Sequence, residues 1–213
     1  MTNRTSQTAH VSFGATTVSE LLDAVAARQP TPGGGAIAAL TVAMAVSLGE
    51  MVLRYRIGRT DAAAHDALHR ETLESLGELR STAVMLADTD ARAFERLSAL
   101  WKLPADDRRR HAEWADAVAG AIDAPQRVMA TGLAVLELLA RMSSTVGTSL
   151  RSDLAIAALL AGAGVEAAAW NVRVNLPQLA DDAAATDLEQ ETSRRVAQAG
   201  ALVDAIERTC RGS

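Results

Sequence analysis

The sequence predicts an all-α protein with a single domain, a helical bundle of about five to six helices. Hydrophobic residues make up 49% of the 213 residues and aromatic residues only 3%, with Ala dominant. Ala and Leu favour helices, whereas the residue types that favour strands are sparse. No internal repeat, linker or low-complexity block divides the chain, so we expect residues 1–213 to form one domain.

Capping residues and helix breakers place the helix boundaries. Gly58 follows the second helix, Leu103-Pro104 ends the third, and Pro125 is expected to kink the fourth or split it in two. Ser152 is the expected N-cap of the fifth helix, and residues 1–16 are expected to be flexible. In chain order, the expected helices run from Thr17 or Ser19 to Arg28, and over residues 34–56, 61–101, 106–142, 152–176 and 186–208.

A proline- and glycine-rich segment, Pro30-Thr31-Pro32-Gly33-Gly34-Gly35, directly precedes the Ala-rich second helix. Glycine allows a sharp turn and the close approach of other groups. The free N–H groups of the helix that follows lie at the positive end of its dipole, where an anionic or carbonyl group can dock. The loop is therefore a candidate binding site, and a plain turn with close helix packing is the alternative.

Composition argues against several classes of partner. The net charge is −5 and no basic tract is interleaved with aromatics, so we expect no nucleic-acid partner. The single cysteine, Cys210, is typical of a reducing cytoplasm, and residues 1–16 do not resemble a signal peptide. Ser47 and Glu50 interrupt the apolar residues 36–53, which we interpret as the central helix of a soluble bundle and not as a membrane span.

Small residues recur along the second and fifth helices, which are apolar nearly all round. Such helices must be covered on every side, and a domain with so few helices covers them most easily in a homodimer. A monomer with a fully enclosed central helix is the alternative.

Sequence motifs for several common chemistries are missing. The glycine run lacks the Lys-Ser/Thr of a P-loop, and no nucleophile elbow is present. His65 and His69 are four residues apart and could share a helix face, but nothing nearby completes a metal site. We interpret them as solvated histidines and expect no metal.

Polar residues within the apolar helices are the other candidates for a functional site, because burying a polar group is costly unless it is paired. Each also has a structural interpretation, as a charge at a helix end or as a partner for backbone groups. Asp153 and Asn171 lie eighteen residues apart on one helix face, about 27 Å along a straight helix. They therefore belong to different sites, or an antiparallel partner subunit brings one copy of each together. The candidates are Asp90, Lys102, Asp153, Asn171 and Asn175.

Five motifs resemble, in order, those of the cyclodeaminase/cyclohydrolase family, which includes the cyclodeaminase domain of formiminotransferase-cyclodeaminase and methenyltetrahydrofolate cyclohydrolases. The resemblance covers residues 18–182 and implies an all-helical dimer with a folate site near the glycine loop and the subunit interface. The motifs are Thr31-Pro32-Gly33-Gly34-Gly35, Asp90-Ala91-Arg92-Ala93-Phe94, Lys102-Leu103-Pro104, Ser152-Asp153-Leu154 and Asn171-Val172-Arg173-Val174-Asn175-Leu176.

The chemistry that this resemblance implies concerns the one-carbon unit between N5 and N10 of tetrahydrofolate. Water adds to the amidinium carbon and the ring opens, or N10 attacks a formimino carbon and ammonia leaves. Both reactions need a proton acceptor and a donor for the leaving nitrogen, and neither needs a cofactor. Asp153 or Asp90 would act as the base or the partner of the cation, and Lys102 as the proton donor or the ligand of a substrate carboxylate. The N–H groups of the glycine loop, residues 33–35, would hold a polar edge of the ligand.

Three positions depart from the family pattern. Arg56 stands where the family usually has Thr, within Tyr55-Arg56-Ile57-Gly58-Arg59; Ala105 follows Leu-Pro where Lys is usual; and residues 146–149 replace a Gly-Asn-type loop. Arg56 and Arg59 are therefore candidate binding residues that could recharge the pocket, together with Pro32, Gly33, Gly34, Gly35, Asn171 and Asn175. A cyclase acting on a cyclic iminium or amidine-like intermediate and a non-catalytic helical dimer are the alternative functions.

Overall fold

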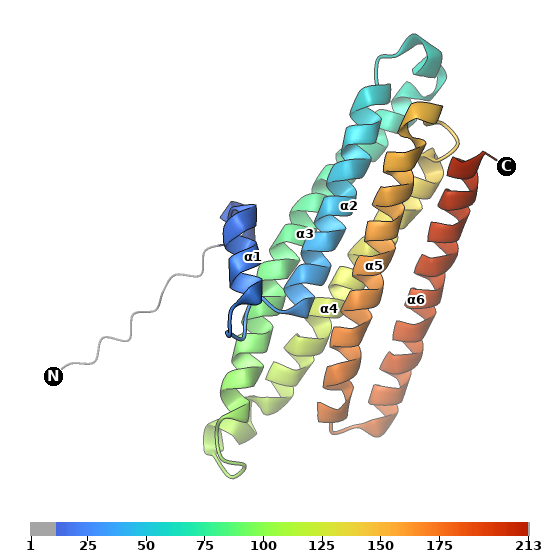
Figure 1. The fold of residues 1–213 in the computed structure, drawn as a ribbon. Helices are drawn as coiled ribbons and strands as arrows, with labels where there is room; N and C mark the ends of the chain where they lie inside the picture. The colour runs from blue at the N-terminus through green and yellow to red at the C-terminus, as the bar shows by residue number, and fades with distance from the viewer. Residues whose placement is uncertain (1–11, 213) are drawn as a thin grey trace.

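The computed structural model describes residues 12–212, which form α-helices and short 3-10 turns and contain no strand. The α-helices are α1 (Val18–Ala26), α2 (Gly34–Arg56), α3 (Asp66–Trp101), α4 (Arg108–Met142), α5 (Arg151–Asn175) and α6 (Asp182–Arg211). The five long helices lie side by side and alternate in direction, while the short α1 lies outside them (Figure 1). The start of α2, the end of α3, the start of α4 and the end of α5 therefore share one end of the bundle.

Helix α2 lies at the centre of the bundle and packs against α3, α4 and α5. It covers the predicted range, because the glycine loop precedes it and Gly58, with φ 79°, follows it. By length and composition, α2 and the segment Thr148–Gln178 could also cross a membrane, but 61% of the apolar window of α2 is buried inside the bundle. Burial on this scale is what a core helix requires, so the prediction of a central bundle helix is confirmed.

Close contact between α2 and α5 depends on glycine. A Cβ added at Gly164 would lie 2.6 Å from Cγ2 of Val42 and 3.1 Å from the carbonyl oxygen of Ala38. The carbonyl oxygen of Ala38 belongs to the backbone, so it cannot move away unless the whole of α2 shifts. We therefore expect Gly164→Ala to lower the free energy of unfolding by about 1–3 kcal/mol. Gly200→Ala in α6, where nothing lies within 4 Å of the added Cβ, should be neutral or stabilising in the same denaturant titration. Equal effects of the two substitutions would contradict this packing.

Several predicted boundaries were wrong, each for a local reason. Helix α3 begins at Asp66, since residues 60–65 form a 3-10 turn. Helix α5 begins at Arg151, directly after another 3-10 turn, so Ser152 lies inside the helix and is not its cap. Helix α6 begins at Asp182, because the Asp181 side chain accepts hydrogen bonds from the first N–H groups. Helix α4 runs through Pro125 without a break, so of the two predicted outcomes, a kink or a split, only the split is wrong.

The start of the described chain is tied to α3. Oγ of Ser12 and the N–H of Phe13 both donate to the buried carboxylate of Asp88, at 2.5 and 2.9 Å. Thr17 then caps α1 in a capping box with Glu20, as predicted for its N-terminus. Residues 1–11, for which we expect flexibility, lie outside the described residues.

Candidate active site

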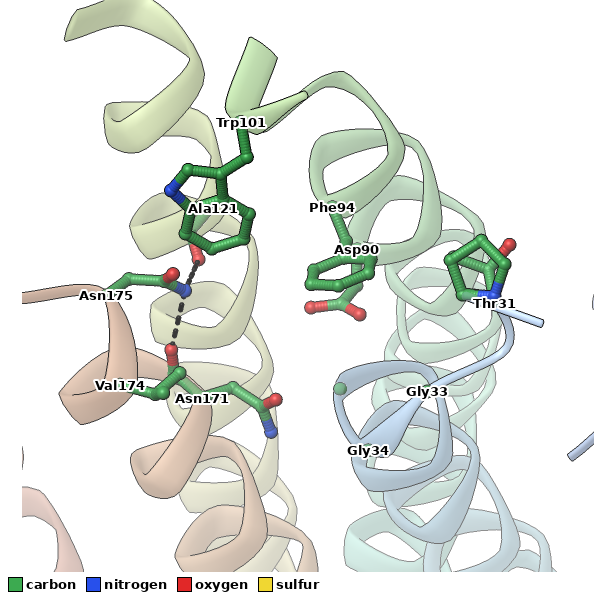
Figure 2. Close-up of a pocket in the computed structure, with 12 residues that line it drawn as sticks. Thr31, Gly33, Gly34, Asp90, Phe94, Trp101, Ala121, Asn171, Val174 and Asn175 are labelled. Carbon is green, nitrogen blue, oxygen red and sulfur yellow. Dashed lines mark hydrogen bonds between the residues drawn. The ribbon is translucent and has the colours of Figure 1, made fainter. Parts of the chain in front are cut away.

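A cavity of about 200 Å³ lies where the start of α2 and the end of α3 face α4 and the end of α5 (Figure 2). On one side are the glycine loop and Asp90, and on the other are Asn171, Val174 and Asn175. The alternating helix directions bring these segments together, although they are far apart in the sequence. The lining residues are Pro30, Thr31, Gly33, Gly34, Gly35, Asp90, Phe94, Trp101, Ala121, Asn171, Val174 and Asn175.

The glycine loop forms the lip of this cavity. Oγ1 of Thr31 donates to Oε1 of Glu95 at 2.7 Å, which ties the loop to α3. Gly33 is the N-cap of α2 and supplies no side-chain cap. A Cβ added at Gly35 would overlap the carboxylate of Asp90, so glycine is required there for the carboxylate to lie against the helix start. Pro32, within this loop, is buried and does not line the cavity.

Asp90 is the one titratable side chain among the lining residues. Burial raises the pKa of its carboxyl to about 6, and a hydrogen bond from the N–H of Ala36 lowers the pKa in part. Because α2 presents its positive dipole end here, the site accommodates the ionised form. A carboxyl group that titrates near neutrality, in a cavity, is suited to accepting and returning a proton.

The two asparagines form the opposite wall. Nδ2 of Asn171 donates to the carbonyl of Ala167 at 3.0 Å, one helix turn earlier. Nδ2 of Asn175 donates to the carbonyls of Ala121 and Asn171, at 3.1 and 2.9 Å. These bonds use the amide nitrogens, so each carboxamide oxygen is an acceptor with no hydrogen-bond partner in residues 12–212. Both predicted asparagines therefore lie at the site.

Two aromatic residues of the cavity were not predicted as site residues. Phe94 and Trp101 meet edge to face with ring centroids 6.5 Å apart, and Trp101 contacts Trp114 in the same way at 6.3 Å. Asp90, Phe94 and Trp101 are spaced by four and seven residues, which places them on one face of α3. That spacing was the signal available in the sequence. The aromatic pair offers an apolar surface beside the carboxylate for a flat ring.

Besides Pro32, four predicted site residues are not brought to this cavity within one chain. Arg56 is buried at the far end of α2, where its Nη1 donates to Oδ2 of Asp61 at 3.1 Å, and Arg59 binds the same carboxylate. The hydrogen bond from Arg56 has the largest effect on the pKa of Asp61 and lowers it, and the hydrogen bond from Arg59 lowers it further. Asp153 lies in the first turn of α5, also at the far end. Lys102 caps the end of α3 near the cavity but is exposed and does not line it.

His69 corrects the interpretation of a solvated histidine pair. It is fully buried, and its Nε2 lies 2.8 Å from Oγ1 of Thr145. Burial is the main cause that lowers the pKa of His69, and the charge of the nearby His65 lowers it further. The ring therefore stays neutral at physiological pH. Within residues 12–212 there is no group of three side chains that could hold a metal ion.

The family model of formiminotransferase-cyclodeaminase matches residues 17–194, which is most of the chain. The chain belongs to this family. It is 32% identical over 200 residues to the methenyltetrahydrofolate cyclohydrolase of Methylorubrum extorquens, covering 92% of this chain and 96% of that protein. It is 31% identical over 191 residues to the formimidoyltransferase-cyclodeaminase of Sus scrofa, but spans only 35% of that longer protein. The crystal structure of formiminotetrahydrofolate cyclodeaminase from Thermotoga maritima superposes with a TM-score of 0.86 at 26% identity, covering 93% of this chain and 98% of the other.

Proposed function

We propose that this member of the formiminotransferase-cyclodeaminase family is an enzyme that acts on the C–N bonds of a one-carbon-bridged tetrahydrofolate. The observation that carries the proposal is the half-buried carboxyl of Asp90, held against the glycine lip opposite two amide oxygens. Hydrolysis of methenyltetrahydrofolate is the preferred reaction, because the cyclohydrolase relative matches over nearly its whole length. Deamination of formiminotetrahydrofolate is the second candidate, supported by the relatives of that name.

In hydrolysis, Asp90 accepts a proton from the water that attacks the amidinium carbon, so that a C–O bond forms and the cation is neutralised. The same carboxyl then gives that proton to N5 as the C–N5 bond breaks, and it takes up the hydroxyl proton as the C=O bond forms. The formyl group stays on N10, and the second proton is released to solvent. The ionised carboxylate also stabilises the cationic substrate before attack. In the deamination, N10 attacks the carbon of the protonated formimino group and a C–N10 bond forms. Asp90 moves the N10 proton to the formimino nitrogen, whose bond to the carbon then breaks to release ammonia. We expect no cofactor and no metal in either reaction.

The cavity holds only part of such a substrate, since its 200 Å³ is below the roughly 300–1,000 Å³ typical of sites for drug-sized ligands. Phe94 and Trp101 would contact the flat ring system, and Lys102, which is exposed and follows Trp101 in the chain, would attract a substrate carboxylate. The rest of the ligand would extend past Gly34 and Val174, both of which are exposed lining residues.

We also propose a homodimer, in which a second copy covers the outer face of α2 and α5. Half-buried and exposed residues recur there at seven-residue spacing and are mostly apolar, which is typical of helices packed along another pair of helices. Within residues 12–212, Met44, Tyr55, Ile156, Trp170 and Val174 of this face are all at least 47% exposed. Each helix carries two such rows of residues. On α2 they are Gly34, Thr41, Leu48 and Tyr55, and Ile37, Met44 and Met51. On α5 they are Asp153, Leu160, Ala167 and Val174, and Ile156, Ala163 and Trp170.

Symmetry gives Asp153 a place in such a dimer. Helices α2 and α5 run in opposite directions. A two-fold axis that lies in their shared face, at right angles to the helices, reverses the direction of both, so one protomer's α5 starts at the same end of the dimer as its partner's α2. Asp153 would then lie beside the glycine lip of the partner. A carboxylate there would add a second negative charge near the amidinium cation.

The direct test of the proposed function is loss of the near-ultraviolet absorbance of methenyltetrahydrofolate, followed with purified protein. We expect the protein to accelerate this loss well above the buffer rate. Release of ammonia from formiminotetrahydrofolate, measured in parallel, would identify the deaminase instead. A folded protein that accelerates neither reaction would overturn the proposal and favour a different cyclic cation as substrate, or a non-catalytic dimer. A cytoplasmic location is part of the proposal.

A further inference from the structure

Pro125 interrupts the hydrogen-bond ladder of α4 beside the cavity. Proline has no N–H, so it gives no helical hydrogen bond to the carbonyl of Ala121, four residues earlier, and its ring also crowds that carbonyl. Helix α4 nevertheless continues from Arg108 to Met142 without a break. Ala121 lines the cavity, so the carbonyl left free by Pro125 lies in the wall of the candidate site.

Asn175 supplies the missing donor. Its Nδ2 lies 3.1 Å from the carbonyl oxygen of Ala121 and 2.9 Å from that of Asn171, which links α4 to α5 (Figure 2). Both acceptors are carbonyls, so rotating the amide by half a turn would place its oxygen against two other oxygens. The two bonds therefore fix which amide atom is the nitrogen, and they leave Oδ1 of a cavity-lining residue as an acceptor.

We infer that Pro125 is a positioning residue of the active site. By freeing the carbonyl of Ala121, it fixes the carboxamide of Asn175 so that Oδ1 presents an acceptor to an N–H donor of the substrate. This inference rests on the proposed function for its substrate, because the pterin ring of a folate carries such donors. Pro125 itself does not line the cavity and acts only through Asn175.

The test replaces Pro125 with Ala, which restores an N–H that competes for the Ala121 carbonyl. Asn175 then loses one of its two acceptors, and we expect KM for methenyltetrahydrofolate to rise about tenfold while kcat changes much less. Val128→Ala is the matched control, since it also removes two carbons from the buried face of α4 but adds no N–H. Pro125→Ser, which also carries an N–H, repeats the test if Pro125→Ala does not fold.

A second readout does not depend on the substrate. The side-chain NH₂ protons of Asn175 should exchange with solvent faster in Pro125→Ala than in the wild type or Val128→Ala, as measured by NMR. In an Asn175→Ala background, Pro125→Ala should have no further effect on KM. Unchanged Asn175 exchange, or an equal effect of Pro125→Ala in both backgrounds, would overturn the inference. An inactive wild type would instead contradict the proposed function, and the exchange measurement would still decide the role of Pro125.

Discussion

Replacing Asp90 with Asn is expected to lower kcat/KM by about 10²–10⁴-fold, the usual contribution of a positioned acid–base group. Asn has nearly the same shape and can still accept the hydrogen bond from Ala36, but it cannot take a proton from water. The glycine lip and the asparagine wall should therefore stay in place while the chemistry is lost. Asp116→Asn, an exposed substitution on α4, is the control and should leave kcat/KM unchanged.

The same substitution should stabilise the fold at neutral pH. Burial raises the pKa of Asp90 from an ordinary 3.8 to about 6, so between these values the native state binds more protons than the unfolded state. Stability contributed by the neutral carboxyl is therefore lost as pH rises from about 4 to 6, a cost of about 3 kcal/mol above that window. Asp90→Asn should unfold at a higher temperature than the wild type at pH 8, with the difference shrinking near pH 4. An active or a less stable variant at pH 8 would contradict this account.

Mixing two inactive variants should restore activity if the partner's Asp153 completes the site. Asp90→Asn and Asp153→Asn each damage both sites of a homodimer, but a heterodimer of the two carries one undamaged site and one doubly damaged site. Random exchange of subunits should therefore recover about a quarter of the wild-type kcat, measured by the absorbance assay.

The control for this experiment mixes Asp90→Asn with Asp90→Ala, which cannot form an undamaged site and should show no recovery. Native mass spectrometry establishes that heterodimers have formed. Full activity of Asp153→Asn alone, or heterodimers without recovery, would exclude Asp153 from the site while leaving the role of Asp90 intact. A protein that stays monomeric at assay concentrations would exclude the dimer.

Much of the fold was predictable because its signals are local. The glycine loop and Gly58 delimit α2, and Thr17 caps α1, as the sequence indicates. Pro125 could not be interpreted correctly from α4 alone, since the donor that replaces its N–H comes from Asn175, fifty residues later on α5. The hydrogen-bond partner of the buried His69 likewise comes from a loop distant in sequence, from Thr145.

The residues of the candidate site can be predicted from the sequence once the alternating directions of the helices are taken into account. In a bundle of alternating helices, the start of α2 meets the ends of α3 and α5, which gathers the glycine loop, Asp90 and both asparagines. The same alternation sends Arg56, Arg59 and Asp153 to the opposite end of the chain's own bundle. Their spacing in the sequence is compatible with a single site only if a second copy is present.

The pH dependence of kcat/KM tests most directly the claim that Asp90 is the base. We expect kcat/KM for methenyltetrahydrofolate hydrolysis to be constant above pH 7 and to fall about tenfold per pH unit below an apparent pKa of about 6, because the carboxylate becomes protonated. The residual activity of Asp90→Asn should show no such transition. A wild-type kcat/KM that stays constant from pH 8 to pH 5, or the same transition in Asp90→Asn, would contradict the assignment.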